Sequence, residues 1–196
     1  MNPRRLSQAI SEGDGISVIV EVDTPEAARS AEDAGAEAIL IPATAAAQLA
    51  AIRGATDLPI LAALAEPGAG GSLDGADACL VDVRDDDRER LEAVHRAVAE
   101  RLELAPRIQS EEHLAFILEE LDPEILVLAA RPGGDDVPLE RVLDLLPDVP
   151  AGKLAIADVG ARTRDEVEEL ERAGVDGVIV AAGNVAELVG TAPPEV

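Results

Sequence analysis

Eight short apolar runs, rich in Val, Ile and Leu, alternate with segments of helical periodicity along the chain, and this alternation limits its fold more than any other feature. The runs span residues 16–22, 37–43, 58–64, 77–83, 104–109, 125–131, 153–159 and 177–182. Continuous apolar runs of this kind are typical of strands in a parallel sheet that is buried on both faces. We therefore predict an α/β protein with eight parallel strands.

Helical periodicity fills most of the connections between these runs. The predicted helices span about 25–34, 44–54, 86–102, 111–121, 138–146 and 164–173, with a short one at 184–189. The third connection, AEPGAGGSLDG at 65–75, is too rich in glycine for a helix, so we predict a loop there. Thr24 before Pro25, and Thr163 three residues before Glu166, form patterns that begin helices.

A short repeat supports a regular architecture. The segments GAEAILI (35–41), GADACLV (75–81) and GVDGVIV (174–180) each place a glycine, a small or apolar residue, an acid and a small residue before three apolar ones. Each reads as a helix-ending glycine that leads into a strand. Eight strands with helical crossovers can form a closed (β/α)8 barrel or an open doubly wound sheet. We predict a single domain over 1–196, with 1–15 as an N-terminal extension and 191–196 as a tail.

The charge balance excludes several classes of partner. Forty acidic and sixteen basic residues give a formal net charge of -24, which would repel nucleic acid and anionic membranes. No apolar run approaches the roughly 20 residues of a membrane span, and the start of the chain has no apolar signal stretch, so we predict a cytoplasmic protein. Lys153 is the only lysine, and this acidic, lysine-poor composition is typical of a halophile. Cys79 alone can form neither an intrachain disulfide nor a cysteine metal cluster.

Read in order, the strands resemble those of indole-3-glycerol-phosphate synthase, the (β/α)8 barrel of tryptophan biosynthesis. VIVEVD (18–23) stands where that family has a strand ending Glu-x-Lys, and LPILAALAE (58–66) where it has LP-x-L followed by Lys-Asp-Phe. The segment 125–184 is the most similar part, with a long connection ending in Leu-Pro and a Gly-Val-Asp lead into the last strand. The resemblance covers roughly 16–190 and implies a compact (β/α)8 TIM barrel whose third helix is reduced to a loop.

Most positions that match the family's catalytic residues are changed. Glu21 and Arg131 match the glutamate of the first strand and the arginine of the sixth. Ala63 stands at the lysine that acts as general acid, and Arg107 at the catalytic glutamate of the fifth strand. Asp158 replaces the glutamate of the seventh strand. Each acid–base role contributes roughly 10²–10⁴ in rate, so the resemblance implies a scaffold that has lost the family reaction, a pseudoenzyme.

The remaining polar side chains are expected at the carboxyl ends of the strands, where barrel sites lie. If the protein is active, the candidate catalytic residues are Glu21, Asp158 and Arg131. The candidate ligand-binding residues are Asp23, Arg107, Gln109, Gly160, Ala161, Gly183 and Asn184. The charged ones could form a structural salt-bridge network, a rebuilt polar site, or a hard-cation site built on Glu21, Asp23 and Asp158, although we predict no metal. The glycines after the seventh and eighth strands could present backbone N–H groups to a phosphate.

Two functions follow from these residues. We predict a non-catalytic relative of the synthase that acts as a small-molecule- or phosphate-binding or regulatory module. The alternative is an active lyase or isomerase of the phosphate-binding barrel group with a rebuilt site for a sugar-phosphate-like substrate. A pocket with converging carboxylates and a strongly shifted pKa would favour the enzyme, and a mouth filled with paired charges would favour the module. We expect no cofactor, and either a small phosphorylated ligand or a second protein chain as partner, the latter on an apolar patch near 58–64.

Overall fold

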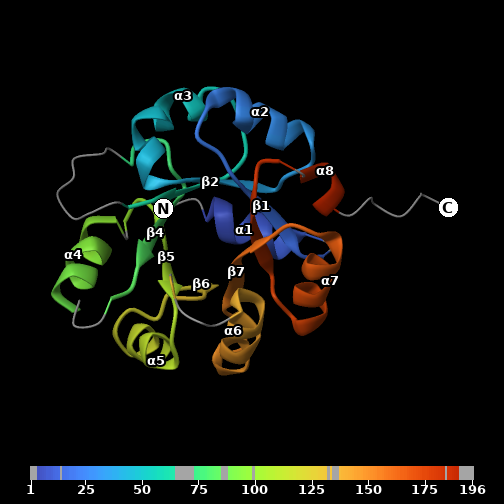
Figure 1. The fold of residues 1–196 in the computed structure, drawn as a ribbon. Coiled ribbons are helices and arrows are strands. Elements are labelled where there is room, and N and C mark those ends of the chain that lie inside the picture. Colours follow the sequence, from blue (N-terminus) through green and yellow to red (C-terminus); the bar gives the residue numbers. More distant parts are fainter. Residues whose placement is uncertain are drawn as a thin grey trace.

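Eight parallel strands pair in chain order, and the first also pairs with the last, so the sheet closes into a barrel (Figure 1). The computed structural model describes residues 4–13, 15–64, 73–84, 88–98, 100–131, 133, 137–183 and 185–189. The strands are β1 (Ser17–Glu21), β2 (Ala38–Ile41), β3 (Ile60–Ala63), β4 (Ala78–Asp82), β5 (Glu103–Ile108), β6 (Ile125–Ala129), β7 (Leu154–Ala161) and β8 (Gly177–Ala181). All eight match the predicted runs to within two residues at each end, and the closed barrel excludes the open sheet.

Helices surround the barrel and fill the connections (Figure 1). They are α1 (Arg5–Glu12), α2 (Pro25–Asp33), η1 (Ala43–Gln48), α3 (Leu49–Arg53), α4 (Arg88–Val98), α5 (Glu111–Glu120), α6 (Pro138–Leu145), η2 (Leu146–Asp148), α7 (Arg164–Ala173) and α8 (Val185–Leu188). The predicted helix at 44–54 is a 3₁₀ helix followed by one short α-helix. Most of the third connection, at 65–72, lies outside the described residues, and residues 73–77 contain no helix.

The prediction for 86–102 was too long at its carboxyl end. Helix α4 ends at Val98, because the N–H groups of Arg101 and Leu102 both turn back to the Val98 carbonyl, each at 2.8 Å. Glu103 then pairs with Ala78 as the first residue of β5, so the strand needs this segment in extended form. Leu102 is buried, but it lies in the turn rather than on the helix.

Alternation along the strands divides the core into two layers. Side chains that point inward fill the barrel, and those that point outward pack beneath the helices. The inner layer contains Ile19, Leu40, Leu61, Leu80, Ala105, Val127, Ile156 and Ile179, all buried. The barrel is therefore filled along its length, and a polar site can lie only at one of its ends.

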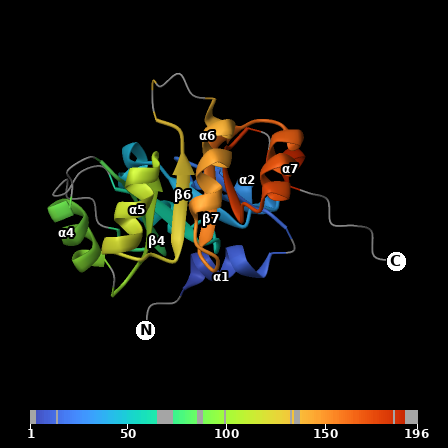
Figure 2. The ribbon, with the colours of Figure 1, turned by 90° about the horizontal axis from the view of Figure 1, so that it is seen from below.

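Helix α1 covers the end of the barrel at which the strands begin (Figure 2). Its residues Leu6 and Ile10 are 0% and 3% exposed and join the inner layer of the barrel. The carboxylate of Glu103, at the start of β5, accepts hydrogen bonds from the N–H groups of Leu6 (2.9 Å) and Ser7 (3.2 Å), which have no partner within the helix. The segment 1–15, expected as an extension outside the repeat, thus contains a helix that completes the core.

The acid of the three-fold sequence repeat has a structural role in the sheet. In each copy it accepts a hydrogen bond from a backbone N–H near the start of the preceding strand. The three bonds join Val18 N to Glu37 Oε2 (3.1 Å), Ile60 N to Asp77 Oδ2 (2.9 Å) and Ala155 N to Asp176 Oδ2 (2.7 Å). The repeat therefore links β1 to β2, β3 to β4, and β7 to β8. In the last copy the leading Gly174 ends α7 with a φ of 97°, a conformation that favours glycine.

Within the described residues, no helix combines the length and apolarity needed to cross a lipid bilayer.

Candidate functional site

The inward positions at the carboxyl ends of the strands define a polar mouth on the barrel. They continue the inward alternation of the inner layer by one step, and four of them carry charge: Glu21 on β1, Asp82 on β4, Arg107 on β5 and Asp158 on β7. The equivalent positions on β3, β6 and β8 are Ala63, Ala129 and Ala181. Charge is thus confined to four strands of the mouth.

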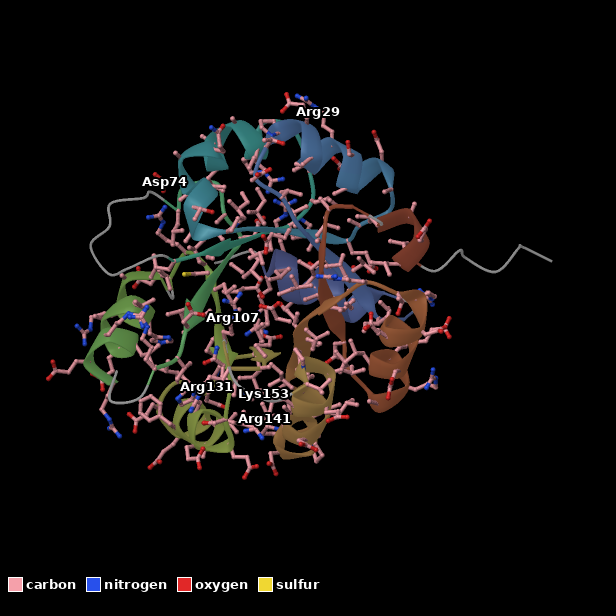
Figure 3. All side chains as sticks on the ribbon, viewed as in Figure 1. Arg29, Asp74, Arg107, Arg131, Arg141 and Lys153 are labelled. Carbon is pink, nitrogen blue, oxygen red and sulfur yellow. The ribbon has the colours of Figure 1, made fainter. Side chains whose placement is uncertain are left out.

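Arg107, which is labelled in Figure 3, forms ion pairs with two of these carboxylates. Its Nη1 lies 3.0 Å from Asp82 Oδ1, and its Nη2 lies 2.9 Å from Asp158 Oδ2. The first pair follows from strand register, since Asp82 and Arg107 are direct partners across β4 and β5. The Arg107 side chain is only 23% exposed, so both ion pairs are partly shielded from water. The mouth therefore contains a connected Asp82–Arg107–Asp158 triad.

Burial raises the pKa of Asp158 above that of an ordinary aspartate. The charge of Arg107 and the hydrogen bond from it act in the opposite direction, and the neighbouring Asp82 charge adds to the rise. Burial outweighs the attraction of Arg107, so Asp158 keeps its proton to a higher pH than an exposed aspartate does.

Asp82 was not among the predicted site residues. A signal for it was present, since Asp82 follows the inward Leu80 by two positions and therefore had to face the mouth. Arg90 on α4 also reaches it, with Nη1 3.1 Å from the Asp82 carbonyl oxygen. Helix α4 thus contacts the backbone of Asp82, while the Asp82 carboxylate pairs with Arg107.

A pocket of about 260 Å³ opens at the mouth beside the triad. Its charged wall is formed by Glu21, Asp82 and Arg107. Its apolar wall comes from β2, β3, β4 and the residues that follow β2 and β3, and consists of Leu40, Pro42, Ala43, Ala63, Leu64 and Leu80. Ligand pockets usually span about 300–1,000 Å³, so this one suits a small molecule.

Three predicted site residues lie near the mouth without lining this pocket. Asp23 is exposed beyond the end of β1, Gln109 is half-buried just after β5, and Arg131 is exposed after β6. Arg131 makes no ion pair with any residue in the described part of the chain. No group of three His, Cys, Asp or Glu side chains in that part could hold a metal ion, so the alternative of a cation site on Glu21, Asp23 and Asp158 finds no support.

The ends of β7 and β8, where a phosphate site was expected, are arranged differently from one another. Gly160 is exposed, and Ala161 is buried beyond an irregularity in the pairing of β7 with β8. At the start of α7, the N–H groups of Arg162 and Thr163 donate to Glu166 Oε2 at 2.8 and 3.0 Å. These bonds lower the pKa of Glu166. The capping box predicted from Thr163 and Glu166 is confirmed, and its carboxylate occupies N–H groups that an anion would need.

The eighth strand offers less for a phosphate. Gly183 is exposed after β8, Asn184 lies outside the described residues, and α8 is only four residues long. So short a helix adds little dipole for anion binding.

No protein-family model and no curated protein matches the sequence. Among solved structures, a protein from Aquifex aeolicus VF5, described as "Structural study of Project ID", matches with a TM-score of 0.69 and 17% sequence identity over 94% of this chain and 97% of that one. The chain is therefore a (β/α)8 TIM barrel. Because 619 solved chains match this structure, the fold alone does not select a function.

Proposed function

We propose that this protein is a non-catalytic barrel, related to the indole-3-glycerol-phosphate synthases, that binds a small molecule in the pocket at its mouth. The observation that carries the proposal is the triad. Arg107, at the position that the resemblance assigns to a catalytic glutamate, is held between Asp82 and Asp158. Paired charges at the mouth are the arrangement expected of a module rather than of an enzyme.

The chemistry of the mouth supports the same reading. An arginine stays protonated in proteins, so Arg107 cannot serve as a general base. Ala63, Ala129 and Ala181 hold three further inward positions and have no group that exchanges a proton. Ring closure by the synthase reaction requires such groups on several strands, and each would contribute roughly 10²–10⁴ in rate.

One observation favours the second candidate, a lyase or isomerase with a rebuilt site. The raised pKa of Asp158 suits a general acid, and Glu21 presents a carboxylate to the same mouth. In this candidate Asp158 would deliver a proton and Glu21 would accept one, with Arg131 at the rim for an anionic group of the substrate. Arg131 is exposed and makes no ion pair within the described residues, so it is available for that role.

Turnover separates the two candidates. The full chain is incubated in about 2 M salt, chosen to screen its acidic charge, with the synthase substrate and with indole glycerol phosphate, and indole absorbance is followed. Melting temperature is recorded alongside, with plain phosphate as a further ligand. We expect no product. Product that disappears in Asp158→Asn would overturn the non-catalytic proposal and establish the second candidate.

A further inference from the structure

We infer that the pocket binds a small organic cation more tightly than an anion of the same shape, and this inference rests on the proposed binding at the mouth. The cation would carry an ammonium group on a compact apolar body. Three features of the pocket favour such a ligand: the charge on its wall, the contacts already made by Arg107, and the apolar surface opposite.

The charge of the mouth is negative. Three carboxylates, those of Glu21, Asp82 and Asp158, occupy its inward positions among the described residues, against the single guanidinium of Arg107. The triad of two carboxylates and one guanidinium carries one net negative charge when ionised, and Glu21 adds a second. An ammonium group entering the pocket would neutralise charge, whereas a carboxylate or phosphate would add to it.

Arg107 is poorly placed to attract an anion. Each of its terminal nitrogens already lies within 3.0 Å of a carboxylate oxygen, and its Nε is buried away from solvent. An incoming anion would have to displace Asp82 or Asp158 and leave that carboxylate beside it. Losing a charged hydrogen bond in this way works against anion binding.

Glu21 provides the contact for a cation. Its side chain is exposed, lines the pocket, and makes no ion pair within the described part of the chain. Leu40, Ala63 and Leu80 line the same pocket with apolar surface, which suits a hydrocarbon body. The volume of about 260 Å³ limits that body to a small ring or short chain.

A matched series of probes tests the inference on the full chain. Cyclohexylammonium, cyclohexanol and cyclohexanecarboxylate share one apolar body and differ in charge, and their affinities are measured by titration calorimetry at one fixed salt concentration. We expect the ammonium to bind about tenfold more tightly than the alcohol, and the carboxylate most weakly. Tighter binding of the carboxylate would overturn the cation inference while upholding binding at the mouth. Failure of all three to bind would overturn the proposed binding function itself.

A pair of variants ties the selectivity to the pocket. Glu21→Gln removes the carboxylate from the wall, and Glu119→Gln makes the same charge change on the exposed outside of α5. We expect Glu21→Gln to weaken cyclohexylammonium about fivefold, allowing for screening at an exposed site, and to leave cyclohexanol unchanged. Glu119→Gln should change neither affinity. An equal loss in both variants would show that the net charge of the chain, and not Glu21, attracts the cation, and would overturn the inference.

Discussion

At the scale of single residues, the guanidinium of Arg107 organises the mouth. It joins β5 to Asp82 on the neighbouring strand and to Asp158 two strands away on the other side. A partly buried charge of this kind stabilises the fold only while its partners are present, because an unpaired charge left behind loses hydration without compensation. The stability of the fold therefore depends on the charges of Asp82, Arg107 and Asp158.

Replacing Arg107 tests that link. Arg107→Met removes both ion pairs and leaves Asp158, 26% exposed, without its partner. We expect the free energy of unfolding to fall by about 1–3 kcal/mol, at the lower part of the range for buried pairs because Asp82 is partly solvated. Urea unfolding measures the change. Arg29→Met, an exposed arginine on α2, is the control and should stay within about 0.5 kcal/mol. Equal losses in the two variants would contradict the role of the triad.

The pKa of Asp158 predicts a pH dependence of known sign. Because burial raises the folded pKa above the unfolded value of about 3.9, folding favours the neutral carboxyl. Its stabilising contribution is fully present below that unfolded value and is lost as pH rises through the folded pKa. The wild-type free energy of unfolding, minus that of Asp158→Asn, should therefore fall as pH rises from about 3 to 7. A difference that rose with pH would show that Arg107 outweighs burial.

At the scale of the element, local patterns predicted the strands and most helices, since most strands here are nearly continuous apolar runs. Helix α1 escaped prediction because its anchor is distant: Glu103 lies 97 residues from Leu6. The candidate site also has a part that local patterns predict and a part that depends on distant contacts. Alternation places Glu21, Arg107 and Asp158 at one mouth, but the pairing of Arg107 with Asp82 depends on the register between β4 and β5, which no local pattern sets.

The role assigned to α1 is open to a direct test. Leu6 is fully buried at the end of the barrel interior, so Leu6→Ala would leave a cavity among inner-layer side chains. We expect a loss of about 2–5 kcal/mol in the free energy of unfolding, measured in urea. Gln8→Ala, an exposed position on the same helix, serves as the comparison and should cost far less. Near-wild-type stability of Leu6→Ala would mean that α1 does not complete the core.

At the scale of the whole molecule, a formal net charge of -24 sets the conditions under which the barrel is stable. Like charges repel over about 30 Å in 0.01 M salt but only about 10 Å in 0.1 M and 3 Å in 1 M. We expect the melting temperature to rise with sodium chloride, most steeply below about 0.1 M, where the screening length changes most. A melting temperature that did not depend on salt would show that repulsion between the acidic side chains does not limit stability. It would also contradict the prediction of a halophilic origin.

The acids of the sequence repeat link three of the eight pairs of neighbouring strands, and β5–β6 is not one of these three. They join β1 to β2, β3 to β4, and β7 to β8, but Glu124, which directly precedes β6, is paired instead with Arg4 at 2.7 Å. The register between β5 and β6 is also brief, with Arg107 opposite Val127 and Ile108 opposite Leu128. We therefore expect the junction between β5 and β6 to be the weakest in the barrel wall. Among the strands, amide hydrogen exchange should be fastest along β5 and β6. The barrel would then unfold locally at β5, the strand that carries Arg107, and the polar mouth would lose its structure before the other strands separate.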